Sequence, residues 1–254
     1  MKRRAFLGAI GTVGSLATIG YAMRTPKTTL EVRVWLSETA ATYDGVIDRV
    51  LEYLGSMLDF DHWSLDLSAG GVVSVSTEDG ARITSRGEWP RIVASGAIGR
   101  RDIEPAADAN VLITDGQMVT APTGYGIPHV ASVGGARHLA ALPPFDDLLA
   151  RDDVDASQKI VPNAAPTRSI QILAHEIGHA LGLGHKHGVA YRYGDAIVST
   201  PMLSSYAWSP DHDRSESACG TSYPDPDGLE RRLNLVFSAC ARRELARYGG
   251  SLPA

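Results

Sequence analysis

The sequence predicts one α/β domain of the α+β kind, in which helices pack against a mixed sheet. Three observations predict it: an alternating strand near the start, a long amphipathic helix directly after it, and a short strand with an apolar centre further along. Strands and helices in this order favour a sheet covered by helices over an all-helical domain. A chain of 254 residues is long enough for one sizeable core and too short for a comfortable second one.

The first strand and the first helix are predicted from hydrophobic periodicity. Residues 30–36 alternate, with Leu30, Val32, Val34 and Leu36 on one face, which is typical of a strand. In residues 40–58 the apolar side chains recur at three- and four-residue intervals, which predicts a helix.

Short apolar segments between turn residues predict the remaining strands, and residues 110–114 are apolar enough to be central and buried. Near the end of the chain, helical spacing predicts a long C-terminal helix over residues 227–248. The predicted strands are residues 64–67 and 72–76 on either side of a glycine break at 69–71, residues 92–94, residues 110–114, and residues 129–133 as an edge strand. Residues 123–126 are expected to form a turn.

The most informative segment is residues 175–185, HEIGHALGLGH, which ends an apolar run with helical spacing. On a helix, His175 and His179 lie on one face, about 6 Å apart along the axis. Glu176 is rotated by about 100° from His175, so it can hold a water instead of sharing the metal. Gly182 permits the left-handed turn that ends a helix and returns His185 to the same ion. Three imidazole ligands with an open fourth position are typical of a catalytic zinc site.

The alternative is a helix whose histidines are surface or satisfied core residues. With 8 His and 26 Gly in 254 residues, the five fixed positions coincide by chance in roughly a few chains per hundred thousand. We therefore favour the metal site.

This segment resembles the metzincin signature of zinc metallopeptidases, H-E-x-x-H-x-x-G-x-x-H. In organisation the resemblance covers roughly residues 28–210 and looks closest to matrixin-like or generic prokaryotic members. It implies a twisted mixed sheet with two long helices in an upper subdomain, about residues 28–184. A smaller, mostly irregular or helical lower subdomain, about residues 185–254, would follow. It also implies that a substrate strand pairs with an edge strand above the zinc, for which residues 131–135 are the candidate.

The resemblance also implies a downstream turn whose methionine lies under the metal, and Met202 is the candidate. Some metzincins use a tyrosine two residues after that methionine as an extra ligand. This chain has Ser204 there and Tyr206 two residues later, so Tyr206 is not assigned as a ligand, and a role beside the substrate is its alternative. The cysteine switch of some matrixins is absent, because both cysteines follow the zinc motif.

The function expected from the motif is that of an exported zinc-dependent endopeptidase acting on a protein or peptide substrate. One Zn²⁺ would be held by the three histidines, with Glu176 as the general base. One alternative is an exported zinc- or peptide-binding module without proteolytic activity. Another is an enzyme that uses Glu216 or Glu230 as the third ligand in place of His185.

Other polar residues carry weaker expectations. His129 and His138 are expected at the surface, and His187 near the metal or in solvent. Ca²⁺ prefers carboxylate oxygens, but the acidic residues lack EF-hand spacing, and we expect a solvated loop. These acidic residues are Asp146, Asp147, Asp152, Asp153 and Asp155, with Asp211, Asp213, Asp225 and Asp227 interpreted in the same way.

The N-terminus predicts export. Lys2-Arg3-Arg4 precedes an apolar run over residues 5–22, and the paired arginines before Phe6 resemble a twin-arginine signal. Residues 1–25 are therefore expected to be a signal, with an uncleaved membrane anchor as the alternative. The catalytic domain would span residues 28–254.

The two cysteines, Cys219 and Cys240, are expected to form one disulfide in an exported protein, with two free thiols as the alternative. In the entropic model such a loop contributes about 3 kcal/mol. A net charge of −5 gives no reason to expect a nucleic-acid surface. We expect a monomer, with any membrane contact confined to the N-terminal segment.

Overall fold

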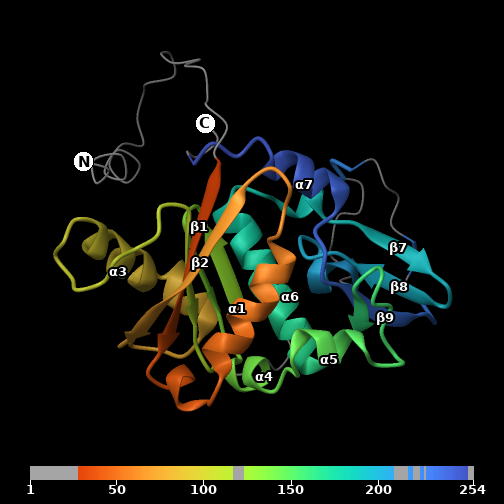
Figure 1. Ribbon diagram of the computed structural model, residues 1–254, viewed down its shortest axis with the longest axis horizontal. Helices are drawn as coiled ribbons and strands as arrows, with labels where there is room; N and C mark the ends of the chain where they lie inside the picture. The colour runs from red at the N-terminus through yellow and green to blue at the C-terminus, as the bar shows by residue number, and fades with distance from the viewer. Residues whose placement is uncertain (1–27, 117–122, 209–216, 220–223, 226, 251–254) are drawn as a thin grey trace.

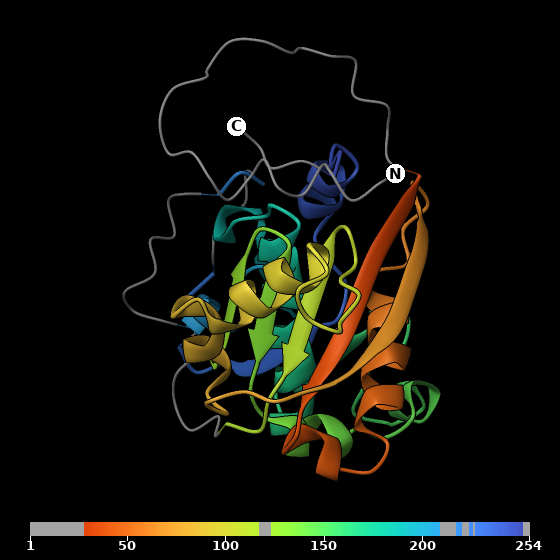
Figure 2. The same cartoon turned by 90° about the vertical axis from the view of Figure 1, so that its left-hand side faces the viewer.

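A five-stranded mixed sheet organises the first half of the chain (Figures 1 and 2). The computed structural model describes residues 28–116, 123–208, 217–219, 224–225 and 227–250. The strand order is β2-β1-β3-β5-β4, in which β4 alone runs antiparallel to its neighbour. The strands are β1 (Thr29–Ser37), β2 (Ser64–Val73), β3 (Ala109–Ile113), β4 (Gly124–Ile127) and β5 (Val130–Val133).

One face of this sheet is covered by the two longest helices, α1 (Val46–Met57) and α6 (Ala165–Ala180), which lie side by side in Figure 1. The shorter helices α4 (Ala136–Ala140) and α5 (Phe145–Leu149) extend this layer. The alternating apolar side chains of β1 enter the core on this face, as the spacing of residues 30–36 predicts.

The opposite face is covered by α2 (Gly80–Ser85) and α3 (Glu88–Ala97), so the sheet lies between two helical layers. Trp35 and Trp89 lie in this second core, with ring centroids 6.1 Å apart and ring planes inclined by 64°. Such edge-to-face pairs add to the stabilisation that comes from burial.

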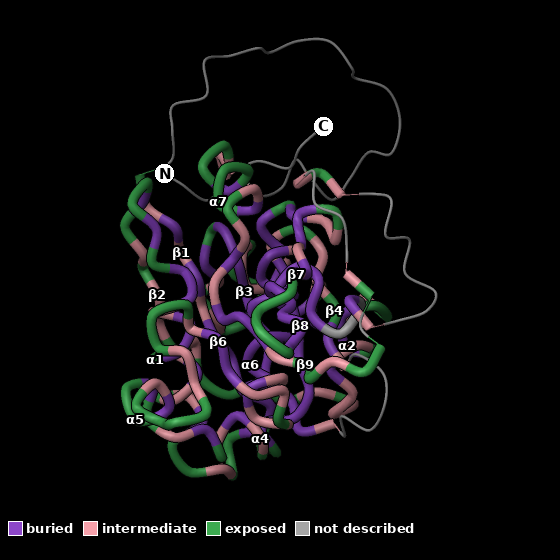
Figure 3. Tube along the Cα trace, turned by 90° about the vertical axis from the view of Figure 1, so that its right-hand side faces the viewer, coloured by how far each residue is buried: buried purple, intermediate pink, exposed green. Residues whose placement is uncertain are grey.

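A second, four-stranded sheet is formed by one strand before α6 and three strands after it, and it faces the viewer in Figure 3. Its order is β6-β9-β8-β7, with a parallel pair between β8 and β9 and antiparallel pairs elsewhere. The fold is therefore a mixed α+β arrangement with two mixed sheets. The remaining elements are β6 (Ile160–Pro162), β7 (Ala190–Tyr193), β8 (Ala196–Ser199), β9 (Glu230–Asn234), α7 (Ala239–Leu245), and the 3-10 turns η2 (Ala40–Thr42), η3 (His185–His187) and η4 (Ser204–Trp208).

Several elements agree with the sequence prediction. Residues 110–114 lie in the central strand β3, all of whose residues are buried. The helix expected over residues 40–58 exists but begins at Val46, because Gly45 adopts a left-handed conformation with φ 70° at its N-terminus. Within the described ranges no helix is long and apolar enough to span a membrane, and the expected signal at residues 1–25 lies outside those ranges.

Two strand predictions were wrong: the two separate strands at residues 64–67 and 72–76, and the strand at residues 92–94. Residues 64–73 form one strand instead of two, and the register against β1 shifts near Gly70. A Cβ at Gly70 would overlap the Trp35 indole, so this glycine makes room for the ring and does not end the strand. Residues 92–94 belong to α3, because Trp89, Ile92 and Val93 lie on one helical face and pack against the sheet.

The predicted edge strand and the predicted turn were also wrong. Residues 130–133 form a fully buried inner strand, and residues 124–127, expected as a turn, form the true edge strand β4. The candidate at residues 131–135 is therefore not at a sheet edge, and the open edge on this side of the sheet is β4. The glycines of β4 allow it to pack closely against α6. From the sequence alone, glycines with this role cannot be distinguished from glycines in a turn.

The C-terminal prediction was wrong as well. Residues 230–234 pair with β8 and β6 as strand β9, and only Ala239–Leu245 is helical. The C-terminal part therefore contributes three strands to a sheet, although most of its described residues are irregular or helical, as expected. Pairing with strands far along the chain outweighs a local apolar pattern that also fits a helix.

Asp115 connects the end of β3 to Tyr43, which precedes α1, and to α4, and it generates a prediction about stability. Its carboxylate accepts hydrogen bonds from Tyr43 Oη (2.6 Å), from Arg137 Nη2 (2.6 Å) and from the Arg137 backbone N–H (3.0 Å). Burial alone would raise the pKa of Asp115, but these hydrogen bonds outweigh it and hold the pKa below the usual value. A depressed pKa stabilises the fold above the unfolded value, near 3.9, and that contribution is lost as the pH falls through the folded pKa.

We expect Asp115→Asn to lower the free energy of unfolding by about 1–3 kcal/mol at pH 6, the typical net value of hydrogen bonds to a charged group. The difference from the parent protein should shrink below about pH 4, where the parent loses the same charge. Urea unfolding at pH 6 and pH 3, in the presence of a chelator, measures this. An equal difference at both pH values would contradict it.

Candidate metal centre

Helix α6 carries His175 and His179, and hydrogen bonds define both of its ends. Near its start, the Ala164 backbone N–H donates to Thr167 Oγ1 at 3.1 Å. At its end, Gly182 has φ 89°, and the Leu183 N–H donates to the Gly178 carbonyl at 2.8 Å. This is the hydrogen-bond pattern of a glycine-terminated helix. The turn directs the chain back so that η3 brings His185 to the helix end.

The three histidines converge at this end. The Nε2 atom of His179 lies 3.0 Å from Nε2 of His175 and 3.1 Å from Nε2 of His185. Within the described part of the chain, these side chains form the one group of three or more metal-binding residues whose ligand atoms gather together. His175 is buried and the other two are half-buried, so the group opens towards solvent on one side.

Two backbone carbonyls fix the orientation of the rings. His175 Nδ1 donates to the Pro201 carbonyl at 2.7 Å, and His179 Nδ1 donates to the Leu183 carbonyl at 2.8 Å. A carbonyl oxygen only accepts, so Nδ1 carries the hydrogen and the Nε2 lone pair faces the shared centre. Such partners are common behind metal-binding histidines.

The imidazoles of His175 and His179 are held neutral, mainly by burial. Burial lowers the pKa of His175 to about 3 and also lowers the pKa of His179. Neutral lone pairs about 3 Å apart repel one another unless a cation lies between them. The spacing suits one divalent ion with nitrogen ligands near 2 Å, and imidazole nitrogens suit a first-row ion such as Zn²⁺. The three histidines can therefore hold a metal ion.

Glu176 lies next to this group without belonging to it. Its residue is 4% exposed, and burial raises the pKa of its carboxyl to about 8, while a hydrogen bond from the Gly126 backbone N–H opposes the shift. A cation at the imidazoles would also lower the pKa of Glu176, because it attracts the charged carboxylate. The sequence predicted that Glu176 is rotated by about 100° from His175 around the helix axis. This rotation agrees with the position of Glu176 outside the group of three imidazoles.

Strand β4 packs directly on Glu176 and His179, which the sequence did not indicate. A Cβ at Gly124 would lie 2.6 Å from Glu176 Oε1, and a Cβ at Gly126 would lie 2.8 Å from the Cβ of His179. The two glycines face α6 at strand spacing and allow the edge strand to lie against the helix. Glycines two residues apart were the one signal that could have indicated it.

Met202 lies on the other side of the helix from β4. It is fully buried, and a Cβ at Gly178 would overlap its sulfur. Its neighbour Pro201 provides the carbonyl that orients His175. The chain segment around Met202 therefore packs beneath the helix that carries the histidines. Tyr206 lies in η4, but its side chain is outside the part of the structure described.

Of the other polar residues named from the sequence, those in the described ranges do not gather with the three histidines. His129 Nδ1 donates to the Asp108 carbonyl at 3.0 Å, and His187 Nδ1 accepts the Gly184 N–H at 3.0 Å. Glu230 is exposed on β9, and Glu216 lies outside the described ranges. Asp155 is hydrogen-bonded to Tyr193 and to Ser157. No group of acidic side chains in the described residues gathers as a metal site.

Cys219 and Cys240 form a disulfide in the structure, with their Cα atoms 5.5 Å apart.

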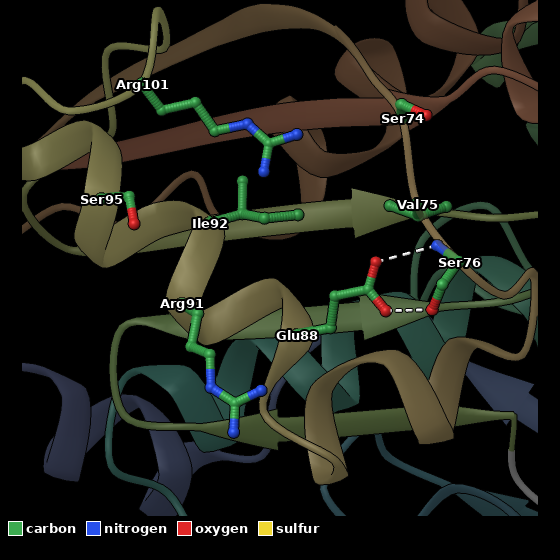
Figure 4. Close-up of a pocket in the computed structure, with 8 residues that line it drawn as sticks. All are labelled: Ser74, Val75, Ser76, Glu88, Arg91, Ile92, Ser95 and Arg101. Atoms are coloured by element: carbon green, nitrogen blue, oxygen red, sulfur yellow. Dashed lines mark hydrogen bonds between the residues drawn. The ribbon is translucent and has the colours of Figure 1, made fainter.

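A separate open groove of about 520 Å³ lies on the opposite side of the large sheet, beside α3 (Figure 4). Glu88 accepts a hydrogen bond from the Ser76 backbone N–H within it, at 2.8 Å. None of the three histidines lines this groove, so it is distinct from the metal centre.

Comparisons with known proteins leave the family open. No family model matches the chain, and no curated protein matches it. Among the solved structures that match, one is described as "Structure of a chaperone-substrate complex", with 10% sequence identity and a TM-score of 0.36. The match covers 70% of this chain, and this chain spans only 27% of that one. A likeness this weak carries no argument about function.

The metal centre generates a direct prediction. His185→Ala should lower the affinity for Zn²⁺ by at least about 100-fold, because one of three ligands is lost. Titration of the purified protein against a chromogenic chelator measures the affinity. Glu230→Gln is the matched control and should bind as tightly as the parent protein. Equal affinity in the His185→Ala variant would show that the three imidazoles do not act on one ion.

Proposed function

We propose that this protein is an exported, zinc-dependent endopeptidase of the metzincin type that hydrolyses peptide bonds in protein or peptide substrates. One observation carries the proposal: three imidazole nitrogens converge on one point, and the buried carboxyl of Glu176 lies on the helix that carries two of them. Purely structural zinc sites need four protein ligands and have no use for an adjacent carboxyl.

His175, His179 and His185 would hold the ion. When bound, Zn²⁺ supplies a Lewis acid that polarises the scissile carbonyl and acidifies a water at neutral pH. Glu176 accepts the proton of the attacking water and returns it to the nitrogen of the leaving amine. Its buried position, with one hydrogen bond from Gly126, keeps the carboxyl oriented for both transfers.

Strand β4 supports a peptide as the substrate class. It is the edge strand of the large sheet, and its glycines place its backbone against Glu176 and His179. An extended peptide can add to such an edge through main-chain hydrogen bonds, as peptides do at other open sheet edges. The scissile bond would then pass beside Glu176.

The metzincin type is supported by the residue pair Gly178 and Met202. The methionine turn of that family lies under its metal, and here the buried Met202 packs on the glycine between the two helical histidines. Export is supported by the arginine-rich N-terminus and agrees with a disulfide, since disulfides persist in oxidising compartments.

The first functional prediction concerns Glu176→Gln. Glutamine keeps the shape but cannot take a proton, so hydrolysis of casein should fall by at least about 100-fold while zinc content stays at one ion per chain. Zinc content and cleavage, with and without chelator, are measured on the parent protein and the variant. Unchanged cleavage in the variant would overturn the assigned role. A zinc-loaded parent that cleaves no substrate would instead favour a binding module.

The second concerns Gly124→Ala. The added Cβ would lie 2.6 Å from Glu176 Oε1, so either the carboxyl or the edge strand must move. We expect turnover to fall by at least about tenfold, since small displacements of a positioned base are costly, with zinc still bound. Gly55→Ala in α1 is the matched control, because nothing lies within 4 Å of its Cβ position. Equal activity in both variants would contradict the packing argument.

A further inference from the structure

The loop that carries His185 is held by two segments from far along the chain. Residues 217–219 approach it from one direction and residues 238–240 from another, and the disulfide between Cys219 and Cys240 joins them. Their contacts with the loop fall on the carbonyl groups of Lys186 and His187, the two residues that directly follow the third histidine.

These contacts are short and specific. The Ala218 backbone N–H donates to the Lys186 carbonyl at 2.9 Å, and the Ser238 hydroxyl donates to the His187 carbonyl at 2.6 Å. The two disulfide sulfurs lie 3.5 Å and 3.6 Å from the same His187 oxygen. The His187 carbonyl is therefore surrounded by the disulfide and by Ser238.

The other side of the loop rests on the methionine segment. The Val189 N–H donates to Thr200 Oγ1 at 2.9 Å, and a Cβ at Gly188 would overlap the backbone of Leu203. The loop thus lies between the segment around Met202 and the disulfide. Its 3-10 turn of three residues is too short to hold its own shape.

The support of the His185 loop differs from the support of the other two histidines. His175 and His179 lie on a helix of 16 residues, where regular hydrogen bonds determine their positions. His185 lies on a loop, and metal sites on loops are less exact unless surrounding groups hold them.

We propose that the Cys219–Cys240 disulfide and Ser238 are positioning elements of the metal centre. They hold the carbonyls of Lys186 and His187 and thereby keep His185 close to the other two imidazoles. The inference rests on the proposed metal centre but concerns residues that do not touch the ion.

Ser238 permits a sharp test, because its hydroxyl has two roles. It donates to His187 and also accepts the Ala241 N–H at 3.1 Å, as the N-cap of α7. Ser238→Asp keeps an N-cap acceptor but cannot donate to the His187 carbonyl. Ser238→Thr keeps both roles. The double variant Cys219→Ser with Cys240→Ser removes the disulfide.

Zinc affinity is measured by chelator competition, and the visible absorption of bound Co²⁺ reports ligand number and geometry. We expect Ser238→Asp and the double cysteine variant to lose affinity by about tenfold or more, as removal of groups that orient ligands does, with an altered Co²⁺ spectrum. Ser238→Thr should match the parent protein. Leu148→Ala, a core change on α5, controls for general destabilisation and should leave both readouts unchanged in the folded protein.

The outcomes separate the two proposals. A parent protein that binds no Zn²⁺ would overturn the metal centre itself. A parent that binds one ion, with unchanged affinity and Co²⁺ spectrum in Ser238→Asp, would overturn the positioning role alone. If the double cysteine variant fails to fold, Ser238→Asp and Ser238→Thr still decide the question.

Discussion

The burial of neutral imidazoles at the end of α6 is the constraint to which the surrounding elements conform. Neutral rings leave their Nε2 lone pairs free only if other groups take the Nδ1 hydrogens, and the carbonyls of Pro201 and Leu183 do this. One of these carbonyls comes from the turn after the helix, and the other comes from the segment before Met202. The helix end and the methionine segment must therefore keep fixed positions relative to each other for the rings to converge.

Glycine is what allows these elements to approach so closely. Gly178 leaves room for the Met202 sulfur beneath the helix, and Gly124 and Gly126 leave room for Glu176 and His179 beneath the edge strand. A side chain at any of these positions would separate two layers that meet at the metal centre. The helix is thus closely packed by the Met202 side chain at Gly178 and by strand β4 at Glu176 and His179.

The two sheets have different parts in this arrangement. The large sheet packs against α6 through β4 and β5 and offers β4 at one of its open edges. The small sheet, with the disulfide beside it, supports the loop that returns the third histidine. A metal centre between a rigid helix and a supported loop is consistent with the proposed peptidase. Its metal ligands would stay in place while one peptide substrate replaces another along the edge strand β4.

The sequence by itself determined the local part of this site. Spacing along a helix is set by backbone geometry, so residues 175–185 predicted which side chains share a face, where the helix ends and why Gly182 must turn. Tertiary structure decided what depends on distant pairing. It made β4 the edge strand instead of a turn, made residues 230–234 a strand instead of a helix, and placed the disulfide on the loop of His185. Local patterns do not contain this information, because a glycine or an apolar residue fits several structures until another segment packs against it.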